Sequence, residues 1–478
     1  MQGTVIRFSD IRGYGFIHGE DDCDYFVHQS KINMLGYRSL IPGEKVEFDP
    51  VHTDRGNQAF NVTLLRAVPR AQPILTDEAS TEVVLRKNPF TPQDPIVDPS
   101  KFAGRKSEAI RALRYLFDGA NILIQGPRGI GKSSFAHQLL QVKKGNFDFL
   151  DRNRIKISTR ENSSTICWYG CSSGDNLSDI ANGLIKSLTF ELTGKVNVSD
   201  TIDTKVLNLG DIQKQITTTT KNLSLTEVAN DFSLIVRRMC SENGSFSGIT
   251  FLIDEIDVLN KDISIAPFLK IVCENFSRST DFNYLFILCG VTGTITRLIR
   301  EHKSSSRLFQ PIDLTQFTKE EIIDLIDITL AESGVTMAEE AKSRIVYLSN
   351  RFPHPAQLLG YHAFINCSGN IISYDDVLYS QNMIVQTIKE QEFLTKWTKH
   401  KESIQSQILQ IIAVDSDDTF TYDTIKKQIS TLSKDQIIGA ISNLLREEIV
   451  DRVSSGSQRF AFREPLFKIY LQWIYQDV

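Results

Sequence analysis

Hydrophobic and polar positions alternate with a period of two over residues 1–66, and turn dipeptides such as Arg12-Gly13 interrupt the alternation. This rhythm is typical of several short strands in a small all-β barrel or sandwich. From about 101 to 400, apolar runs of strand length alternate with amphipathic helical spacings, the signature of a layered α/β fold. The chain after about 402 is mostly helical, with one β-like stretch. The pattern therefore predicts three parts of different structural class.

A proline-rich segment separates the first two parts. Residues 67–100 carry six prolines and few apolar periodicities, as expected of an extended linker that leads into a new domain. The length of 478 residues also predicts about three domains, each large enough to bury its own core. Repeats are absent from the sequence, so a solenoid is not expected.

Composition excludes several classes of protein. The chain has 53 Lys+Arg and 58 Asp+Glu, a net charge of −5, and 41% apolar residues. These values exclude a histone-like basic protein, a collagen and a disordered acidic chain. The first ten residues lack the apolar core of a signal peptide, and no stretch approaches the roughly 18 apolar residues of a membrane helix. We therefore expect a soluble, cytoplasmic protein without a membrane partner.

Seven cysteines are scattered along the chain, an odd number that fits reduced thiols better than a disulfide framework. Cys167 and Cys171 have the spacing of half a metal site. No second Cys or His pair at zinc-finger spacing lies nearby, so we expect buried free thiols there. No Ser/His/Asp or Cys/His arrangement predicts a nucleophilic site.

The strongest chemical signal is a glycine-rich loop between an apolar strand and a helix. Asn121–Gln125 is followed by a G-x-x-x-x-G-K-S motif and then by apolar residues at helical spacing. Such a loop wraps phosphates with backbone N–H groups, its lysine reaches the β- and γ-phosphates, and its serine hydroxyl ligates Mg²⁺. A chance glycine turn is the alternative, although strand, loop and helix occur in the required order. The predicted nucleotide-binding residues are Gly126, Pro127, Arg128, Gly129, Ile130, Gly131, Lys132, Ser133 and Ser134.

A second apolar strand ends in two adjacent carboxylates, Asp254 and Glu255. Behind a phosphate-binding loop, this pair predicts Asp254 as a partner of Mg²⁺ together with Ser133, and Glu255 as the general base that polarises a water. Alone, such a pair is more often a solvated strand end. Glu255 and Lys132 are the predicted catalytic residues. A third apolar strand ends at Thr292, which either senses the γ-phosphate or caps a helix.

These motifs resemble the AAA+ and related STAND ATPases, and the details look closest to prokaryotic ATPases akin to the origin-recognition clade. The resemblance covers about 88–478 and is carried by Asn88-Pro-Phe, by Phe102-Ala-Gly-Arg105-Lys-Ser-Glu108, by both nucleotide motifs and by Phe352-Pro-His-Pro355. It implies ATP and Mg²⁺ bound between a core and a helical lid, with Pro355 at the nucleotide. It also implies an oligomer in which Arg307 reaches a neighbour's nucleotide; a surface arginine is the alternative.

The C-terminal stretch predicts three helices and a hairpin that turns at Ser455-Gly456. This is the composition of a winged helix, which the ATPase resemblance also implies at this place. Such a unit can put its third helix into the DNA major groove. However, residues 402–478 hold 8 Lys+Arg and 11 Asp+Glu, a net charge of −3. Duplex DNA and a protein partner therefore both remain open, because phosphate contacts need basic residues.

The N-terminal part resembles a cold-shock domain, an OB-type five-stranded barrel, along its full length. The resemblance rests on Gly13-Tyr14-Gly15-Phe16-Ile17 and on Asp24-Tyr-Phe26-Val-His28. Strand alternation puts these aromatic side chains on one face, a platform on which unpaired bases stack. Core packing of the aromatics and a barrel that recognises a protein are the alternatives. Arg7 stands where the family carries a tryptophan. The predicted residues for single-stranded RNA or DNA are Phe8, Tyr14, Phe16, Phe26, His28 and Tyr37.

The predicted organisation is multidomain. An OB-type cold-shock barrel at 1–66 and a linker at 67–88 precede an α/β P-loop ATPase core at 89–315, a helical lid at 316–398 and a winged helix at 399–478. A Thr- and Asn-rich insertion near 190–225 is expected to form a partner surface. We predict an ATP-dependent switch that couples hydrolysis to single-stranded nucleic acid and possible oligomerisation. The alternatives are a nucleotide-holding adaptor that binds an effector protein and a DNA-binding regulator.

Positive charge concentrates in the predicted ATPase core. Residues 101–200 hold 15 Lys+Arg and 9 Asp+Glu, a net charge of 15 − 9 = +6, whereas the barrel holds 7 and 9, a net charge of −2. A polyanion groove is therefore as compatible with Arg152, Arg154, Lys156 and Arg160 as with the barrel. For the barrel, stacking is the stronger argument for nucleic-acid binding.

Overall fold

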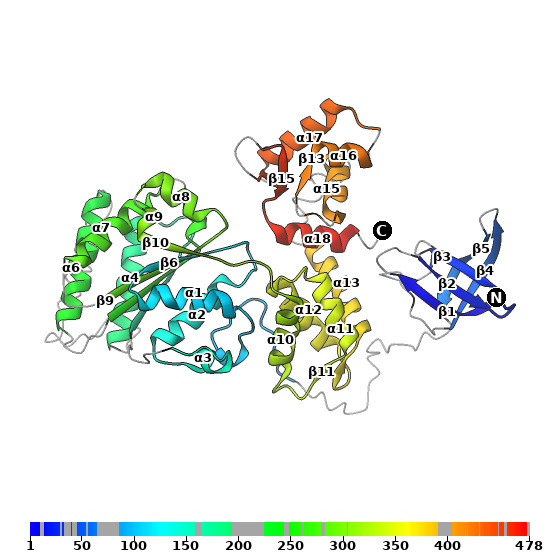
Figure 1. Cartoon of the computed structure of the whole chain (residues 1–478), viewed down its shortest axis with the longest axis horizontal. Helices are drawn as coiled ribbons and strands as arrows, with labels where there is room; N and C mark the ends of the chain where they lie inside the picture. The colour runs from blue at the N-terminus through cyan, green and yellow to red at the C-terminus, as the bar shows by residue number, and fades with distance from the viewer. Residues whose placement is uncertain are drawn as a thin grey trace, which may run out of the picture. The chain divides into compact units, whose positions relative to one another are not determined.

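The computed structural model (Figure 1) describes residues 1–9, 14–28, 31–32, 40, 45–53, 56–64, 86–157, 164–193, 224–242, 248–260, 262–278, 283–303, 305–390, 404–415, 417, 419–429, 431–447, 449–453 and 457–475. Several predictions fall outside these residues, namely those for Tyr37, Arg160, the turn Ser455-Gly456 and most of the linker and of segment 190–225. The chain divides into two compact units. One consists of residues 1–88, 338–344 and 362–478, and the other consists of residues 89–337 and 345–361. The barrel, the α/β core, the segment predicted as a lid and the C-terminal part are described one by one.

The first part is the expected OB-type barrel, closed in the strand order β1-β2-β3-β5-β4. Its strands are β1 (Gln2–Ser9), β2 (Tyr14–Gly19), β3 (Asp24–His28), β4 (Lys45–Thr53) and β5 (Gly56–Leu64). Neighbouring strands are antiparallel except β3 and β5, which run parallel. Alternate residues such as Val5, Ile17 and Val27 fill the interior with 2% or less of their surface exposed. Closure removes unpaired strand edges, and the other alternate positions lie on the outside.

The second part is an α/β core around a five-stranded parallel sheet in the order β10-β6-β9-β8-β7. The strands are β6 (Asn121–Gln125), β7 (Thr165–Gly170), β8 (Gly248–Asp254), β9 (Asn283–Gly290) and β10 (Phe309–Asp313). β6 and β8 are buried along their whole length, as strands covered on both faces are. Because all strands are parallel, their carboxyl ends meet at one edge of the sheet. The chain reverses its direction of winding beside β6, and ligands bind at such an edge.

Helices cover both faces of this sheet (Figure 1). An apolar cluster joins β7, β8 and β9 to helices on one face, with the stacked rings of Phe251 and Phe286 4.8 Å apart at its centre. Those helices are α4 (Leu177–Thr193), α6 (Leu225–Glu242), α7 (Ile265–Ser277), α8 (Thr294–Glu301) and α9 (Ser305–Leu308). The other face carries α1 (Lys106–Phe117) and α2 (Lys132–Lys143), with α3 (Asp148–Arg152) beyond them; the short 3₁₀ turns are η2 (Pro99–Lys101) and η4 (Ile256–Val258). Right-handed crossovers require this division between the faces.

The segment predicted as a lid is helical. It contains α10 (Lys319–Leu330), β11 (Thr336–Met337), α11 (Glu339–Leu348), α12 (Pro353–Asn366), β12 (Ile371–Ile372) and α13 (Tyr374–Glu390). Thr318 begins α10 with a capping box, because its hydroxyl accepts from Glu321 N at 3.1 Å while the Glu321 carboxylate accepts from Thr318 N at 2.8 Å.

The C-terminal part contains three helices and a hairpin, followed by a last helix that the sequence analysis did not predict. These elements are α15 (Ile404–Val414), β13 (Phe420–Thr421), α16 (Tyr422–Gln428), α17 (Lys434–Arg446), β14 (Val450–Arg452), β15 (Arg459–Phe462) and α18 (Pro465–Tyr475). The strands form an antiparallel sheet in the order β13-β15-β14. Ser433 and Gln436 form a capping box at the start of α17. The classification as a winged helix remains a proposal.

Within the described ranges, no helix combines the length and the apolar character needed to cross a membrane. Cys167 and Cys171 are buried free thiols in this structure, and burial raises the pKa of both.

One buried arginine connects the first helix of the core to the phosphate-binding loop. Arg105, 1% exposed, donates from Nη2 to Ile130 O at 2.9 Å and from Nη1 to Thr315 O at 2.6 Å. Its ion-pair partner is Glu108, with Nη1 to Oε1 at 3.0 Å. The guanidinium also lies 4.3 Å from the centre of the Phe317 ring. A single side chain thus orders the loop and the segment that follows β10.

We predict that replacing Arg105 by Met destabilises this core. The change removes the ion-pair partner of Glu108 and the donor to two backbone carbonyls, in a site where Arg105 itself is buried, which costs about 3 kcal/mol or more. Hydrogen exchange of peptides from residues 121–143, read by mass spectrometry, measures the free energy of local opening. Arg111→Met, at an exposed position of the same helix, is the matched control and should change it by less than about 0.5 kcal/mol. Equal protection in both variants would contradict the role given to Arg105.

Candidate nucleotide site and aromatic barrel face

The phosphate-binding loop links the end of β6 to the start of α2. Gly129 and Gly131 have φ angles of 73° and 92°, in the region that favours glycine. A Cβ on Gly126 would lie 2.7 Å from Leu314 O, so only glycine fits against the chain that follows β10. The N-terminus of α2 directs unpaired N–H groups to the loop, which suits an anion such as a phosphate. The local sequence therefore produces the fold that the motif predicts.

Lys132, the first residue of α2, folds back over the loop. Its ammonium Nζ donates to Gly126 O at 3.0 Å and to Pro127 O at 3.1 Å. Burial lowers the pKa of Lys132, whereas the carboxylates of Asp257 and Asp254 act in the opposite direction. A half-buried cation that donates to two neutral carbonyls is well placed to exchange them for phosphate oxygens.

The carboxylates predicted for metal binding and catalysis lie at the end of β8. Asp254 is 6% exposed, and its Oδ1 accepts from Glu255 N at 2.8 Å. Glu255 is exposed and has a φ angle of 56°, an unusual backbone conformation for a non-glycine residue. Desolvation, followed by the charges of Asp254 and Asp257, raises the pKa of Glu255. A raised pKa increases the proton affinity of the carboxylate, as a general base requires.

Asp257 is a third carboxylate of this site that the sequence argument missed. Its Oδ1 accepts from Val291 N at 3.1 Å, and its Oδ2 lies 3.6 Å from Arg128 Nη2. Asp257 therefore joins the end of β9 to the phosphate-binding loop. Its position in the short turn η4, directly after the carboxylates that end β8, was the available signal.

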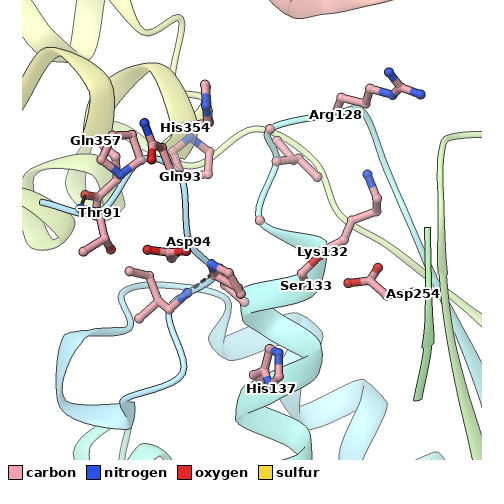
Figure 2. A pocket seen from close by; sticks show the side chains of 18 of the residues that line it. Thr91, Gln93, Asp94, Arg128, Lys132, Ser133, His137, Asp254, His354 and Gln357 are labelled. Atoms are coloured by element: carbon pink, nitrogen blue, oxygen red, sulfur yellow. Dashed lines mark hydrogen bonds between the residues drawn. The ribbon is translucent and has the colours of Figure 1, made fainter. Parts of the chain in front are cut away.

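A cavity of about 780 Å³ opens beside the loop, within the range of small-ligand pockets. Figure 2 shows Lys132, Ser133 and Asp254 on one side of it and the leading segment Thr91–Ile96 on another. The leading segment is tied to α2 and α12. Ile96 N donates to Ser134 Oγ at 3.0 Å, and Thr91 N donates to Gln357 Oε1 at 3.1 Å. Ser134 therefore holds the wall of the pocket.

The start of α12 closes the pocket opposite α2. His354 N donates to Gly129 O at 3.2 Å, and a Cβ on Gly131 would lie 3.7 Å from Pro353 Cγ. Burial lowers the pKa of the His354 imidazole, so the ring is neutral near pH 7. Its buried Nδ1 has no hydrogen-bond partner among the described residues. Pro353 and His354 both line the pocket, whereas Pro355, the predicted contact, is buried outside the lining.

Two further predicted residues lie outside the pocket lining. Thr292 is exposed in the turn before α8, and the N-cap of that helix is Gly293, so the alternative of Thr292 as a helix cap is wrong. Arg307 is exposed in α9. This exposure is compatible both with a residue that reaches another subunit and with an ordinary surface arginine.

The predicted loop residues Gly126 and Pro127 contribute backbone carbonyls, which accept hydrogen bonds from Lys132 Nζ.

His137 and Trp168 line the pocket, although the sequence argument did not single them out. His137 lies one helical turn after Ser133 on α2 (Figure 2), and burial lowers the pKa of its imidazole. Trp168 lies on β7 and is 50% exposed, an unusual exposure for its size. The helical spacing of His137 was readable from the sequence; the position of β7 beside β8 was not.

The donor set fits Mg²⁺. Ser133 and Asp254 both line the pocket and offer a hydroxyl and a carboxylate oxygen. No group of three or more His, Cys, Asp or Glu side chains arranged to hold a metal occurs in the part of the chain that is described. Mg²⁺ needs no such cage, because it is commonly held by one or two protein oxygens together with substrate phosphates and water.

The barrel carries a second candidate site, an aromatic face on β2 and β3. The rings of Tyr14 and Phe26 are 5.4 Å apart, and those of Phe16 and Phe26 are 5.8 Å apart. The strand register puts Tyr14 opposite His28 and Phe16 opposite Phe26. These side chains are half-buried or exposed, while the alternate residue Val27 is 0% exposed. The four residues thus lie on the outer face, and the alternative of core packing does not apply to them.

Phe8 does not join this face. It pairs with the buried Gly15 and packs against the barrel interior. A register shift between Val5 and Arg7 changes which residues of β1 point inward. Strict alternation along β1 fails at this bulge. The structure therefore places Phe8 away from the aromatic face on which the sequence predicted it.

Three solved structures overlap with most of the chain. They are a Walker-type ATPase of Pyrococcus abyssi, with 13% identity, a TM-score of 0.49 and coverage of 80% of this chain and 99% of that one, and two Aeropyrum pernix proteins. The ORC1 protein of Aeropyrum pernix in complex with DNA is 14% identical, with a TM-score of 0.41 and coverage of 78% of this chain and 92% of that one. The ORC2 protein of the same organism is 14% identical, with a TM-score of 0.43 and coverage of 78% of this chain and 93% of that one. All three scores are below 0.5, so the case for the core rests on its own sheet order and loop.

The family model for the 'Cold-shock' DNA-binding domain matches residues 1–65. Cold shock protein CspA of Staphylococcus saprophyticus is 53% identical over 64 residues, which make up 13% of this chain and 97% of that protein. CspA of Staphylococcus aureus matches with the same identity and coverage. Together with the closed barrel and its outer aromatic face, these matches show that the chain belongs to the cold-shock family through its N-terminal domain.

Proposed function

We propose that the chain is an ATP-dependent molecular switch, which binds and hydrolyses ATP in the core and binds single-stranded RNA or DNA on the barrel. The observation that carries the first half is the convergence of Lys132, Ser133, Asp254 and Glu255 on one pocket. The resemblance of the sequence motifs to AAA+ and STAND ATPases supports the same reading. The second half is supported by the outer aromatic face and by the cold-shock match over residues 1–65.

Each group of the pocket has a role in phosphoryl transfer. Lys132 would exchange the carbonyls of Gly126 and Pro127 for β- and γ-phosphate oxygens. Ser133 and Asp254 would hold Mg²⁺, which neutralises charge on the phosphates. Glu255 accepts a proton from the attacking water, and its raised pKa suits that step. Asp257 orients Arg128, whose guanidinium lies 3.6 Å from it, toward the mouth of the loop.

The walls of the pocket provide a route by which bound nucleotide changes the protein. The leading segment contacts α12 through Thr91 and Gln357, and α12 contacts the loop through His354 and Gly129. A nucleotide in the pocket would touch all three elements, so it favours one arrangement of them over others. This coupling is the physical basis of the proposed switch.

Assembly and further partners belong to the same proposal. Exposed Arg307 would reach the nucleotide of a neighbouring copy in a nucleotide-dependent homo-oligomer. The C-terminal winged helix would bind a protein or duplex DNA, and its net charge of −3 over residues 402–478 favours the protein. Arg152, Arg154 and Lys156 are exposed on the core and offer a separate basic patch for a polyanion.

We predict that Glu255→Gln lowers steady-state ATP turnover by about 10²-fold or more, because a general base contributes 10²–10⁴-fold to the rate. Nucleotide binding should persist in this variant, since Lys132 and the loop are intact. Phosphate release, measured with and without single-stranded oligonucleotide, reads the rate. Glu332→Gln, at an exposed position in the same compact unit, residues 89–337 with 345–361, is the control. Absence of turnover in the wild type under every condition would favour the adaptor that holds nucleotide without hydrolysis.

We predict that the double variant Tyr14→Ala/Phe26→Ala of the full chain binds a labelled single-stranded oligonucleotide at least about tenfold more weakly. Each base stacked on an aromatic side chain contributes about 1–3 kcal/mol. Fluorescence anisotropy titration measures the affinity. Thr4→Ala, exposed on β1, is the control variant. Equal affinity of the wild type, the double variant and Thr4→Ala would contradict the stacking role and favour a barrel that binds a protein.

A further inference from the structure

A large aromatic side chain on β5 faces outward beside the aromatic face. Along this strand Ala59 is 1% exposed and Val62 is 0% exposed, so both point into the barrel. Phe60 alternates with Ala59 and is only half-buried. A phenylalanine placed outside a barrel is not needed for the core, which the residues on either side of it already fill.

A β-bulge holds Phe60 in this direction. Glu47 pairs with Thr63, but Asp49 pairs with Phe60, so β5 has one residue more than β4 at this point. The extra residue is Asn61, with a φ angle of 49° and a hydrogen bond from Nδ2 to Asp49 Oδ2 of 2.8 Å. Bulges re-aim side chains, and Asn tolerates this backbone conformation better than most residues. The orientation of Phe60 is therefore built into the strand.

The strand register places Phe60 next to the aromatic face. β3 and β5 run parallel, with Phe26 beside Gln58 and Val27 beside Ala59. Continuing this register by one residue puts His28 beside Phe60, and His28 is opposite Tyr14 on β2. Neighbouring strands lie about 4.8 Å apart, so Tyr14, His28 and Phe60 form a row across three strands.

A cation accompanies the ring. Lys31 Nζ lies 4.1 Å from the centre of the Phe60 ring, within the range of a cation–π contact. In single-stranded nucleic acid, each base is followed along the backbone by a phosphate. Because the Lys31 ammonium lies over the ring face, a base that stacks on that face would displace it toward the adjoining phosphate. The ring and the ammonium group would then offer one partner each to base and phosphate, which is the combination that proteins use to bind unpaired strands.

We propose that Phe60 and Lys31 form an additional nucleotide subsite on β5, in which Phe60 stacks a base and Lys31 contacts the adjoining phosphate. This inference rests on the proposed binding of single-stranded nucleic acid by the barrel. The subsite extends the face from two strands to three, beyond the residues predicted from the sequence. It adds one of the few basic groups to a barrel whose net charge is −2 over residues 1–66.

The test compares oligothymidylates of increasing length on the full chain. The wild type should gain affinity when the strand becomes long enough to reach β5. Phe60→Leu, which keeps an apolar side chain but has no π face, should remove that gain, about fivefold or more, and leave the shortest oligonucleotides bound as before. Phe60→Tyr should restore the gain. Lys31→Gln should lower the slope of log affinity against log salt by about 0.7, the value for one phosphate contact on a single strand.

Binding of every length by Phe60→Leu with wild-type affinity would overturn the subsite, even if Tyr14→Ala/Phe26→Ala loses binding as expected of the main face. A uniform loss at all lengths in Phe60→Leu, with circular dichroism unchanged, would also overturn it, because Phe60 would then support the face rather than add to it. A wild-type chain that binds no oligonucleotide would overturn both the subsite and the proposed nucleic-acid function.

Discussion

The nucleotide pocket depends on the buried guanidinium of Arg105. Its donors satisfy the carbonyl of Ile130 in the phosphate-binding loop and that of Thr315 after β10, and Glu108 balances its charge. Burial alone lowers the pKa of Arg105, but a guanidinium remains charged in proteins. Because a buried charge is costly unless every partner is in place, the loop, α1 and the start of the lid segment are ordered together. The proposed roles of Lys132 and Asp254 depend on the positions that this network fixes.

Local signals made the phosphate-binding loop predictable from sequence. The glycines, Lys132 and Ser133 are contiguous, and their backbone conformations follow from residue type, so neighbouring residues determine the geometry. The walls of the pocket were not predictable in the same way. Thr91 meets Gln357 and Arg105 meets Thr315 across 266 and 210 residues of sequence. Periodicity carries no information about such pairs. For Asp257, the sequence shows only its place close after Asp254, and its contacts with Val291 and Arg128 come from the structure.

The barrel shows the same limit at a smaller scale. Alternation along β2 and β3 correctly put Tyr14, Phe16, Phe26 and His28 on one face, because neither strand is interrupted. Strict alternation assigned Phe8 to the aromatic face and did not single out Phe60, and both residues lie next to bulges. Phe8 follows the register shift after Val5 and packs against the barrel interior, whereas Phe60 alternates with Ala59 and the bulge after it returns Val62 to the interior. A single inserted residue reverses the side of the sheet that a pattern of period two assigns.

The two sites would recognise polyanions by different physics. The core surrounds its loop with fixed charge and backbone dipoles, in a region with a net charge of +6 over residues 101–200, while the barrel has a net charge of −2. Counterion release would therefore contribute little to strand binding on the barrel, and the flat faces of Tyr14, Phe26 and Phe60 would supply most of its affinity. Stacking tolerates any base, so the barrel is expected to respond to whether a strand is unpaired rather than to its sequence. A sensor of that kind suits a switch whose energy comes from a separate, charge-based site.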